Sequence, residues 1–368
     1  MRVLLVSSFV LPHAGGVEQF VATLRDLLAE SGSEVRVLAC RRPGEDATAD
    51  TVVPTRFIGP SGWPLVTGGW RTLLEEAGRA DAIVANGSLH LLTALAVQAG
   101  RRRRVPSLLV IHGSGQGVRP GDHWLRPARA AFQRTFARSA IRRSLPVSVS
   151  HVGVEGVRRG YGLHAEYLPY PLPPLPAASP VAGPGPGELL RVAWIGRLAP
   201  EKDPLSAVRA VDVVAARRPV TLEVYGNGPL RAAMDACAAT RPWLTLHGTR
   251  PWPEVLAAQE QAHVCLSTSV WDNVQVAVLE SLARGVPVVS TRVGDAPRYY
   301  LTASLARWCV EPGEPKAAGR ALADLAESYD EQRQAFAANG EHLLALHSDA
   351  PRVLMELIAF AGSRQAAG

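Results

Sequence analysis

Two cationic side chains lie close together in the C-terminal half of the sequence, where a strand is expected to give way to a helix. The segment VAWIGRLAPEKDP, residues 192–204, predicts a helix that begins at Pro204 with Asp203 as its N-cap. Arg197 and Lys202 therefore lie in the turn before a helix N-terminus, where a guanidinium and an ammonium can together bind a diphosphate. The alternative is an ordinary pair of surface charges, but a lysine here is unexpected in a chain with 2 lysines and 37 arginines.

A second segment, LSTSVWDNVQVAVLESLARGVPVVS at residues 266–290, supplies carboxylates. A helix is expected to begin near Val274, and the N–H groups of its first turn have no partner within the helix, so they can bind an anion or a hydroxyl. Asp272 precedes this helix and Glu280 lies inside it, so both carboxylates can accept hydrogen bonds from sugar and ribose hydroxyls. Alternatively, Asp272 is only the N-cap and Glu280 a surface acid. The other candidates here are Asn273, Val274, Gln275 and Val276.

The elements that position these residues repeat one unit: a short β-branched run, a turn rich in Gly or Pro, and a helical period. In the first half we expect a helix at 17–32 and strands at 2–6, 34–39, 82–85, 107–111 and 147–150. In the second half we expect helices at 204–217 and 275–284 and strands at 191–195, 221–225, 264–267 and 288–290. This order predicts the α/β class, with two doubly wound, Rossmann-like domains that bind ligands at the carboxyl ends of their strands.

A proline-rich segment separates the two expected domains. Proline fixes φ and removes a backbone donor, so neither a helix nor a central strand can continue through residues 169–186. We therefore expect an N-terminal domain at 1–168 and a C-terminal domain at 187–345. The last segment, 346–368, is expected to be a helix that can pack back on the N-terminal domain.

The basic charge of the chain is confined to its N-terminal part. The net charge is +6, to which residues 1–168 contribute +8 and residues 169–368 contribute −2. One expected helix carries six arginines, several of them on a shared face: Arg126, Arg129, Arg134, Arg138, Arg142 and Arg143. Its apolar side, with Phe132 and Phe136, is expected to pack in the core. The arginine face is either solvated or makes weak contact with an anionic membrane surface or acceptor.

Several other classes of protein do not fit the sequence. Nucleic acid is not expected as a partner, because no aromatic residues interleave the arginines and no DNA-binding motif accompanies them. The four cysteines lie far apart, which favours neither a zinc cage nor a disulfide framework. We expect a cytoplasmic enzyme, since the first residues lack the features of a secretory signal and no apolar run reaches about 18 residues.

Several segments of the sequence, taken in chain order, resemble those of a known family. GRLAPEKD, YGNGP, HG and DNVQVAVLESLARGVPVV, together with PHAGGVEQF and IHG in the N-terminal half, resemble the retaining glycosyltransferases of family four (group 1), in the GT-B superfamily. The resemblance covers nearly the whole chain. The usual signature of the family is a Glu, seven residues and a second Glu; this sequence has Asp272 in the first place, one methylene shorter, and Glu280 in the second.

The resemblance implies a role for each candidate residue. Arg197 and Lys202 would neutralise the diphosphate of a leaving nucleotide, Glu280 would hold ribose hydroxyls and Asp272 a hydroxyl of the donor sugar. His112, at a strand end, would touch the transferred sugar near the reacting carbon, although a lone histidine is more often structural. The remaining positions serve donor binding or form ordinary turns: Gly15, Gly16, Gly226 and Gly228. His13 is a weaker candidate.

The implied reaction is transfer of a sugar, with retention at the anomeric carbon, from a nucleoside diphosphate sugar to a hydroxyl of a small molecule such as a secondary metabolite or an aminocyclitol. A UDP-sugar is the expected donor, and no metal or resident cofactor is expected. Acceptor specificity is expected in the loops at 56–75 and 113–130, where Trp63, Trp70 and Trp124 could stack on a sugar or pack in the core.

Three alternatives remain open. The enzyme could act on a cell-envelope glycolipid at a membrane surface, it could be a nucleotide-sugar epimerase, or it could bind sugar nucleotides without catalysis. A Rossmann dehydrogenase is excluded, because the turn after the first strand lacks GxGxxG.

Overall fold

The structure, a computed structural model, describes residues 1–10, 16–41, 48–59, 62–87, 90–113, 126–175 and 181–367. The chain forms two compact units. Unit 1 comprises Met1–Pro173 together with His347–Gly368, and unit 2 comprises Pro174–Leu346.

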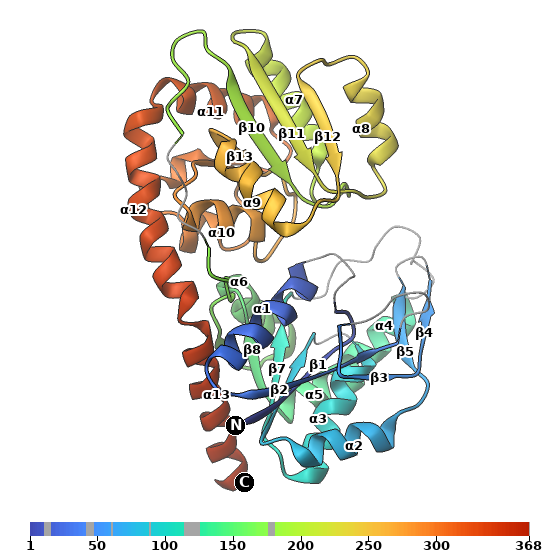
Figure 1. The fold of residues 1–368 in the computed structure, drawn as a ribbon. Helices are drawn as coiled ribbons and strands as arrows, with labels where there is room; N and C mark the ends of the chain where they lie inside the picture. The colour runs from blue at the N-terminus through green and yellow to red at the C-terminus, as the bar shows by residue number, and fades with distance from the viewer. Residues whose placement is uncertain are drawn as a thin grey trace. The chain divides into compact units, whose positions relative to one another are not determined.

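Unit 1 is built on a parallel sheet of seven strands in the order β3-β2-β1-β6-β7-β8-β9 (Figure 1). The strands are β1 (Arg2–Ser7), β2 (Glu34–Cys40), β3 (Thr51–Val53), β6 (Ala82–Asn86), β7 (Ser107–Ile111), β8 (Leu145–Ser148) and β9 (Glu166–Tyr167). The central strands are unbroken apolar runs buried on both faces, as is typical of parallel sheets covered by helices. A separate antiparallel hairpin consists of β4 (Thr55–Ile58) and β5 (Trp63–Val66).

The last helix of the chain belongs to unit 1, where α13 contacts α1 and β7. The helices of this unit are α1 (Gly16–Glu30), α2 (Trp70–Arg79), α3 (Leu91–Arg103), α4 (Arg126–Phe132), α5 (Arg138–Arg142), α6 (His151–Tyr161) and α13 (Ala350–Ala367). The buried His347 side chain, just before α13, lies 2.9 Å from the carbonyl oxygen of Tyr170 through Nδ1. No helix in the described ranges is long and apolar enough to span a membrane.

The arginine-bearing helix differs from the expectation in two ways. A five-residue π-helical segment, Gln133–Ala137, separates α4 from α5, so the arginines do not follow a single α-helical period. Phe132 is buried at 8% exposure, but Phe136 is 57% exposed and stacks on the Phe132 ring. The expectation that Phe136 packs in the core is therefore wrong, because the wider π turn rotates it away from the apolar side.

Unit 2 contains a parallel sheet of six strands in the order β12-β11-β10-β13-β14-β15 (Figure 1). The strands are β10 (Leu190–Ile195), β11 (Val220–Tyr225), β12 (Leu244–Gly248), β13 (Val264–Leu266), β14 (Val288–Thr291) and β15 (Cys309–Val310). The helices are α7 (Pro204–Ala215), α8 (Arg231–Ala238), α9 (Trp252–Gln261), α10 (Val276–Ala283), α11 (Pro315–Glu327) and α12 (Tyr329–Ser348). The direction of winding reverses between β10 and β13, and such a switch point is where open α/β sheets bind ligands.

The predicted fold class is confirmed: each unit is a doubly wound, Rossmann-like parallel sheet with helices. Each strand predicted in the two halves is present, with ends that shift by one or two residues. The sequence did not predict the β4–β5 hairpin, the edge strand β12 or the short strands β3, β9 and β15.

Candidate active site

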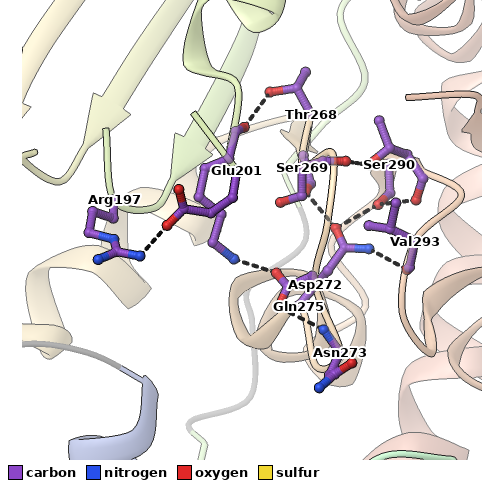
Figure 2. A network of polar contacts seen from close by, with 12 residues as sticks. Arg197, Glu201, Thr268, Ser269, Asp272, Asn273, Gln275, Ser290 and Val293 are labelled. Carbon is purple, nitrogen blue, oxygen red and sulfur yellow. Dashed lines mark hydrogen bonds and ion pairs between the residues drawn. The ribbon is translucent and has the colours of Figure 1, made fainter. Parts of the chain in front are cut away.

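The turn between β10 and α7 carries both predicted cations. Asp203 caps α7, since its side chain accepts a hydrogen bond from the N–H of Ser206 at 3.2 Å, as predicted. Arg197 forms an ion pair with Glu201 across the turn (Figure 2), and Lys202 forms one with Asp272. Each cation is therefore held by a carboxylate at the carboxyl end of the sheet in unit 2.

Several contacts join this turn to the loop after β13. The Val270 N–H donates to the carbonyl of Glu201 at 2.9 Å, and the Thr268 hydroxyl lies 3.1 Å from the carbonyl oxygen of Lys202 and 2.8 Å from that of Asp203. The ion pair between Lys202 and Asp272 is a further contact. The two segments selected from the sequence thus meet in space, across the switch point of the sheet.

Asp272 lies in a largely buried position, with 14% of its side chain exposed. Burial raises the pKa of the Asp272 carboxyl above its usual range, and Lys202 and the Asn273 N–H, which donates to Oδ1 at 3.0 Å, act in the opposite direction. Asp272 is not the N-cap of the following helix; that position is Gln275. The alternative that Asp272 is only a helix cap is therefore wrong.

The helix after Asp272 begins two residues later than expected, at Val276. The N–H groups of the first helical turn are consequently those of Val276, Ala277 and Val278, preceded by that of the N-cap Gln275, and Val274 lies before this turn. Val274 is 9% exposed and Asn273 is 6% exposed.

The Gln275 side chain has a structural role that explains this later start. Its Oε1 accepts hydrogen bonds from the hydroxyls of Ser267 at 2.5 Å and Ser290 at 3.0 Å. Its Nε2 donates to the carbonyl of Val293 at 2.9 Å (Figure 2). The amide thereby ties together the ends of β13 and β14, which leaves the backbone of Gln275 outside the helix.

Glu280 is a buried carboxylate, not a surface acid, with 5% of the residue exposed. The indole Nε1–H of Trp252 donates to its Oε1 at 2.8 Å. Burial raises the pKa of Glu280 to about 7, although Trp252 and Arg284 oppose the shift. The sequence did not indicate Trp252, whose only signal is its place just after β12.

The loop after β11 packs against the turn that carries Arg197. The Leu198 N–H donates to the carbonyl of Asn227 at 3.0 Å. A Cβ on Gly226, whose φ is +134°, would lie 1.9 Å from the Gly196 carbonyl oxygen, and one on Gly228 would lie 2.5 Å from the Leu198 carbonyl oxygen. Both glycines are needed for this close approach, whether or not they contact a ligand.

In unit 1, His112 follows β7 and packs edge-on against Phe20, with ring centroids 4.7 Å apart. Phe20 also contacts Tyr170, whose hydroxyl donates to the carbonyl of Gly16 at 2.7 Å. His112 and Gly16 are therefore linked through Phe20 and Tyr170. Gly15, His13 and Trp124 lie outside the described residues.

The two described tryptophans of the expected acceptor loops contact other side chains. Trp63 in β5 packs edge-on against Phe132, with centroids 5.8 Å apart. Trp70, the first residue of α2, lies under the guanidinium of Arg102 at 5.4 Å. Both are half-buried, so packing accounts for their presence.

A groove of about 560 Å³ lies on the face of the unit 2 sheet next to α9. Its lining includes Glu223 and His247, whose side chains are hydrogen-bonded, and Tyr225 stacked on His247 with centroids 4.5 Å apart. None of the predicted site residues lines it. The site indicated by the chemistry is therefore distinct from this groove.

Comparison with known families accounts for both units. The family model "Glycosyl transferases group 1" matches residues 190–328, and the model "Glycosyl transferase 4-like domain" matches residues 15–171. The chain belongs to the group 1 (GT4) glycosyltransferases. The predicted resemblance is thereby confirmed, and Arg197, Lys202, Asp272 and Glu280 all lie within the first match.

Similar proteins differ in their donors and acceptors. The glycosyltransferase is 26% identical over 323 residues, 80% of each chain, to a GDP-mannose-dependent alpha-mannosyltransferase of Mycolicibacterium smegmatis. It is 34% identical over 107 residues, 28% of each chain, to a 2-deoxystreptamine glucosyltransferase of Streptomyces kanamyceticus. The crystal structure of Anabaena HepE in complex with UDP and glucose shares its GT-B fold with a TM-score of 0.69, at 16% identity over 98% of this chain and 99% of that one.

Proposed function

We propose that this glycosyltransferase moves a sugar, with retention, from a nucleoside diphosphate sugar to a hydroxyl of a small-molecule acceptor. One observation carries the proposal: the turn with Arg197 and Lys202 meets the loop with Asp272 at the switch point of the unit 2 sheet. Two cations beside a helix N-terminus suit the charge of a leaving diphosphate.

In the proposed reaction, the bond from the anomeric carbon to the diphosphate oxygen breaks and a bond to the acceptor oxygen forms on the same face. The acceptor proton passes to an oxygen of the leaving diphosphate. Negative charge grows on that diphosphate in the transition state, and Arg197 and Lys202 stabilise it there. No divalent metal is required in this proposal, because the two side chains supply the positive charge.

Carboxylates on the same unit bind the neutral parts of the donor. Glu280 accepts hydrogen bonds from ribose hydroxyls, and Asp272 accepts one from a hydroxyl of the sugar while it holds Lys202. A diphosphate that approaches Lys202 competes with Asp272 for the ammonium. The shorter Asp272 stays close to Lys202, so this pair sets the position of the cation before the donor arrives.

A UDP-sugar is the first candidate for the donor, because the resemblance to the family implies it. The Anabaena HepE structure, which shares the fold, was solved in complex with UDP. GDP-mannose is the second candidate, favoured by the match over 80% of the chain to an enzyme named for that donor. A direct comparison of the two nucleotides decides between them.

For the acceptor, an aminocyclitol is the first candidate, supported by the partial match to a 2-deoxystreptamine glucosyltransferase. A glycolipid at a membrane surface is the second, because Phe136 is 57% exposed on the segment that bears Arg134 and Arg138. An exposed aromatic residue among arginines is typical of helices that lie at a membrane surface.

The first experiment titrates UDP, GDP and UMP into the wild-type protein, Lys202→Ala and Lys316→Ala, with calorimetry and thermal shift as readouts. The exposed Lys316 is the matched control, since it is the other lysine of the chain and lies on α11. We expect a diphosphate to bind wild type and Lys316→Ala alike and to bind Lys202→Ala much more weakly.

The same variants then test catalysis. Loss of one charge-stabilising contact lowers turnover about 10²-fold or more. The proton NMR coupling of the product anomeric centre reports retention, and release of free nucleotide without acceptor would indicate an epimerase-like reaction. Turnover by Lys202→Ala within a few-fold of wild type contradicts the assignment of the cation.

A further inference from the structure

A line of polar side chains crosses the carboxyl ends of three adjacent strands in unit 1. Ser7 ends β1, Asn86 ends β6 and His112 follows β7. Ser7 and Asn86 are paired in the register of β1 and β6, and Asn86 pairs with Val110 of β7. The three side chains form a chain of hydrogen bonds that ends at the imidazole.

The direction of this chain follows from the single proton of the serine hydroxyl. Ser7 Oγ donates to the carbonyl of Phe9 at 2.7 Å, so its contact with Asn86 Nδ2, at 3.2 Å, is one that it accepts. The Asn86 amide is thereby oriented with Oδ1 toward His112. His112 Nε2 lies 2.5 Å from Oδ1, and because that oxygen can only accept, Nε2 carries the proton.

The surroundings keep this arrangement neutral. Ser7 and Asn86 are buried at 1% and 3% exposure. The pKa of His112 is lowered to about 4, mainly by burial and to a smaller extent by the charge of His90. Phe20, the aromatic neighbour of His112, offers no charge to stabilise an imidazolium.

We propose that Asn86, itself oriented by Ser7, is a positioning residue that holds His112 as the Nε2–H tautomer, with the ring lone pair on Nδ1. Any hydrogen bond at Nδ1 is then one that His112 accepts, so the ring can accept a hydrogen bond from a hydroxyl there and cannot donate one. The tautomer is inferred from the hydrogen bonds alone. Only the assignment of the hydroxyl to a donor sugar rests on the proposed function.

The test measures the imidazole directly by ¹⁵N-labelled histidine NMR, with the His112 signals identified by their loss in His112→Gln. We expect the wild-type protein to show the Nε2–H pattern and no protonation of His112 above pH 5. In Asn86→Ala the Nε2 proton loses its acceptor, so the tautomer is no longer fixed and a mixture with the Nδ1–H form appears. In Ser7→Ala the amide is no longer oriented, and a mixture of tautomers appears as well.

Two further variants sharpen the test. Asn86→Asp keeps the shape but places a carboxylate at Nε2, which raises the pKa of His112 by about one to three units. Ser8→Ala is the matched control, because Ser8 is buried at 2% beside Ser7 and takes no part in the chain of hydrogen bonds. An unchanged tautomer in both Asn86→Ala and Ser7→Ala, with no rise of the pKa in Asn86→Asp, overturns the proposal.

Kinetics then separate this inference from the proposed function. If His112 accepts a hydrogen bond from a sugar hydroxyl in the transition state, Asn86→Ala lowers kcat more than it raises KM for the donor, and Asn86→Asp does not restore kcat. NMR changes without any kinetic effect leave the tautomer established and contradict the role of His112 at the sugar. Kinetic loss without NMR changes contradicts the positioning role itself.

Discussion

Replacing Glu280 by glutamine should make the stability of the protein less sensitive to pH, because the buried carboxyl titrates in the folded state near neutrality. Its pKa is about 7 when folded, against 4.5 for an unperturbed glutamate. The folded chain therefore holds a proton that the unfolded chain has released between these two values. The stabilisation tied to the neutral carboxyl is complete below pH 4.5 and is lost as the pH rises through 7.

The magnitude follows from the two pKa values. Between pH 5 and pH 8, a group with these values changes the free energy of unfolding by about 2.5 kcal/mol. Glutamine at this position has nearly the same shape, retains an oxygen for the Trp252 Nε1–H and does not titrate. The difference in unfolding free energy between Glu280→Gln and wild type should therefore shift by about 2.5 kcal/mol in favour of the variant between pH 5 and pH 8.

Urea unfolding at pH 5, 6.5 and 8, followed by circular dichroism, measures this difference. Glu341→Gln is the control, since Glu341 is exposed on α12 and its replacement should leave the pH dependence as in wild type. A difference between Glu280→Gln and wild type that stays constant with pH would show that the carboxyl is already ionised at pH 5. The account of its burial would then be refuted.

The same titration bears on donor binding. A ribose that donates hydroxyl protons to Glu280 favours the carboxylate, so its binding releases a proton wherever the free protein is protonated. Affinity for UDP should rise with pH up to about 7 and then level off, and Glu280→Gln should lack the part of this rise that does not come from the nucleotide phosphate. Calorimetry in two buffers of different ionisation enthalpy counts the released proton.

Three further predictions follow from the structure. Activity should survive excess EDTA, and its abolition with rescue by Mg²⁺ or Mn²⁺ would contradict the proposal that Arg197 and Lys202 carry the diphosphate charge. Gly228→Ala should lower the free energy of unfolding by roughly 1–3 kcal/mol, because the new Cβ would lie 2.5 Å from a backbone oxygen, whereas Gly160→Ala on α6, with nothing within 4 Å, should not. Sedimentation with anionic vesicles should vanish near 0.5 M salt, since charges are screened within about 4 to 5 Å there; binding that resists salt in wild type and is lost in Phe136→Ser would favour the glycolipid acceptor.

Much of the fold could be predicted because buried parallel strands are short, uninterrupted apolar runs in the sequence. Val3–Val6 and Ile83–Ala85 are apolar without interruption, and a Gly or Pro turn follows most of the strands. The β4–β5 hairpin is less visible, since β5 contains Pro64 and its partner strand has exposed positions. The π segment at Gln133–Ala137 has no breaker residue that would have located it.

Arg197, Lys202 and Asp272 could be selected from the sequence because each lies between the end of a strand and the start of the next helix, where a charge is least needed for packing. Glu280 lies inside α10 and was selected because it follows Asp272 at the spacing of the family signature. The residues that these side chains contact could not be predicted. Trp252 is 28 positions from Glu280, and Asp272 is 70 positions from Lys202, so these pairs exist only through the order of strands in the sheet. Gln275 shows the opposite error, since a polar residue at an expected helix start serves to join two strands.

The two sheets use the same position for different chemistry. In each unit the winding reverses between two neighbouring strands, which are the first and fourth strands of the sheet along the chain. These are β1 and β6 in unit 1 and β10 and β13 in unit 2. In unit 1 the buried, uncharged side chains of Ser7 and Asn86 lie there, joined by a hydrogen bond whose direction is fixed. Unit 2 follows the same two strands with the ion pair of Lys202 and Asp272, whose charges a diphosphate can engage. The two arrangements suit different chemistry, because the direction of hydrogen bonds distinguishes hydroxyls, whereas charge stabilises a leaving diphosphate.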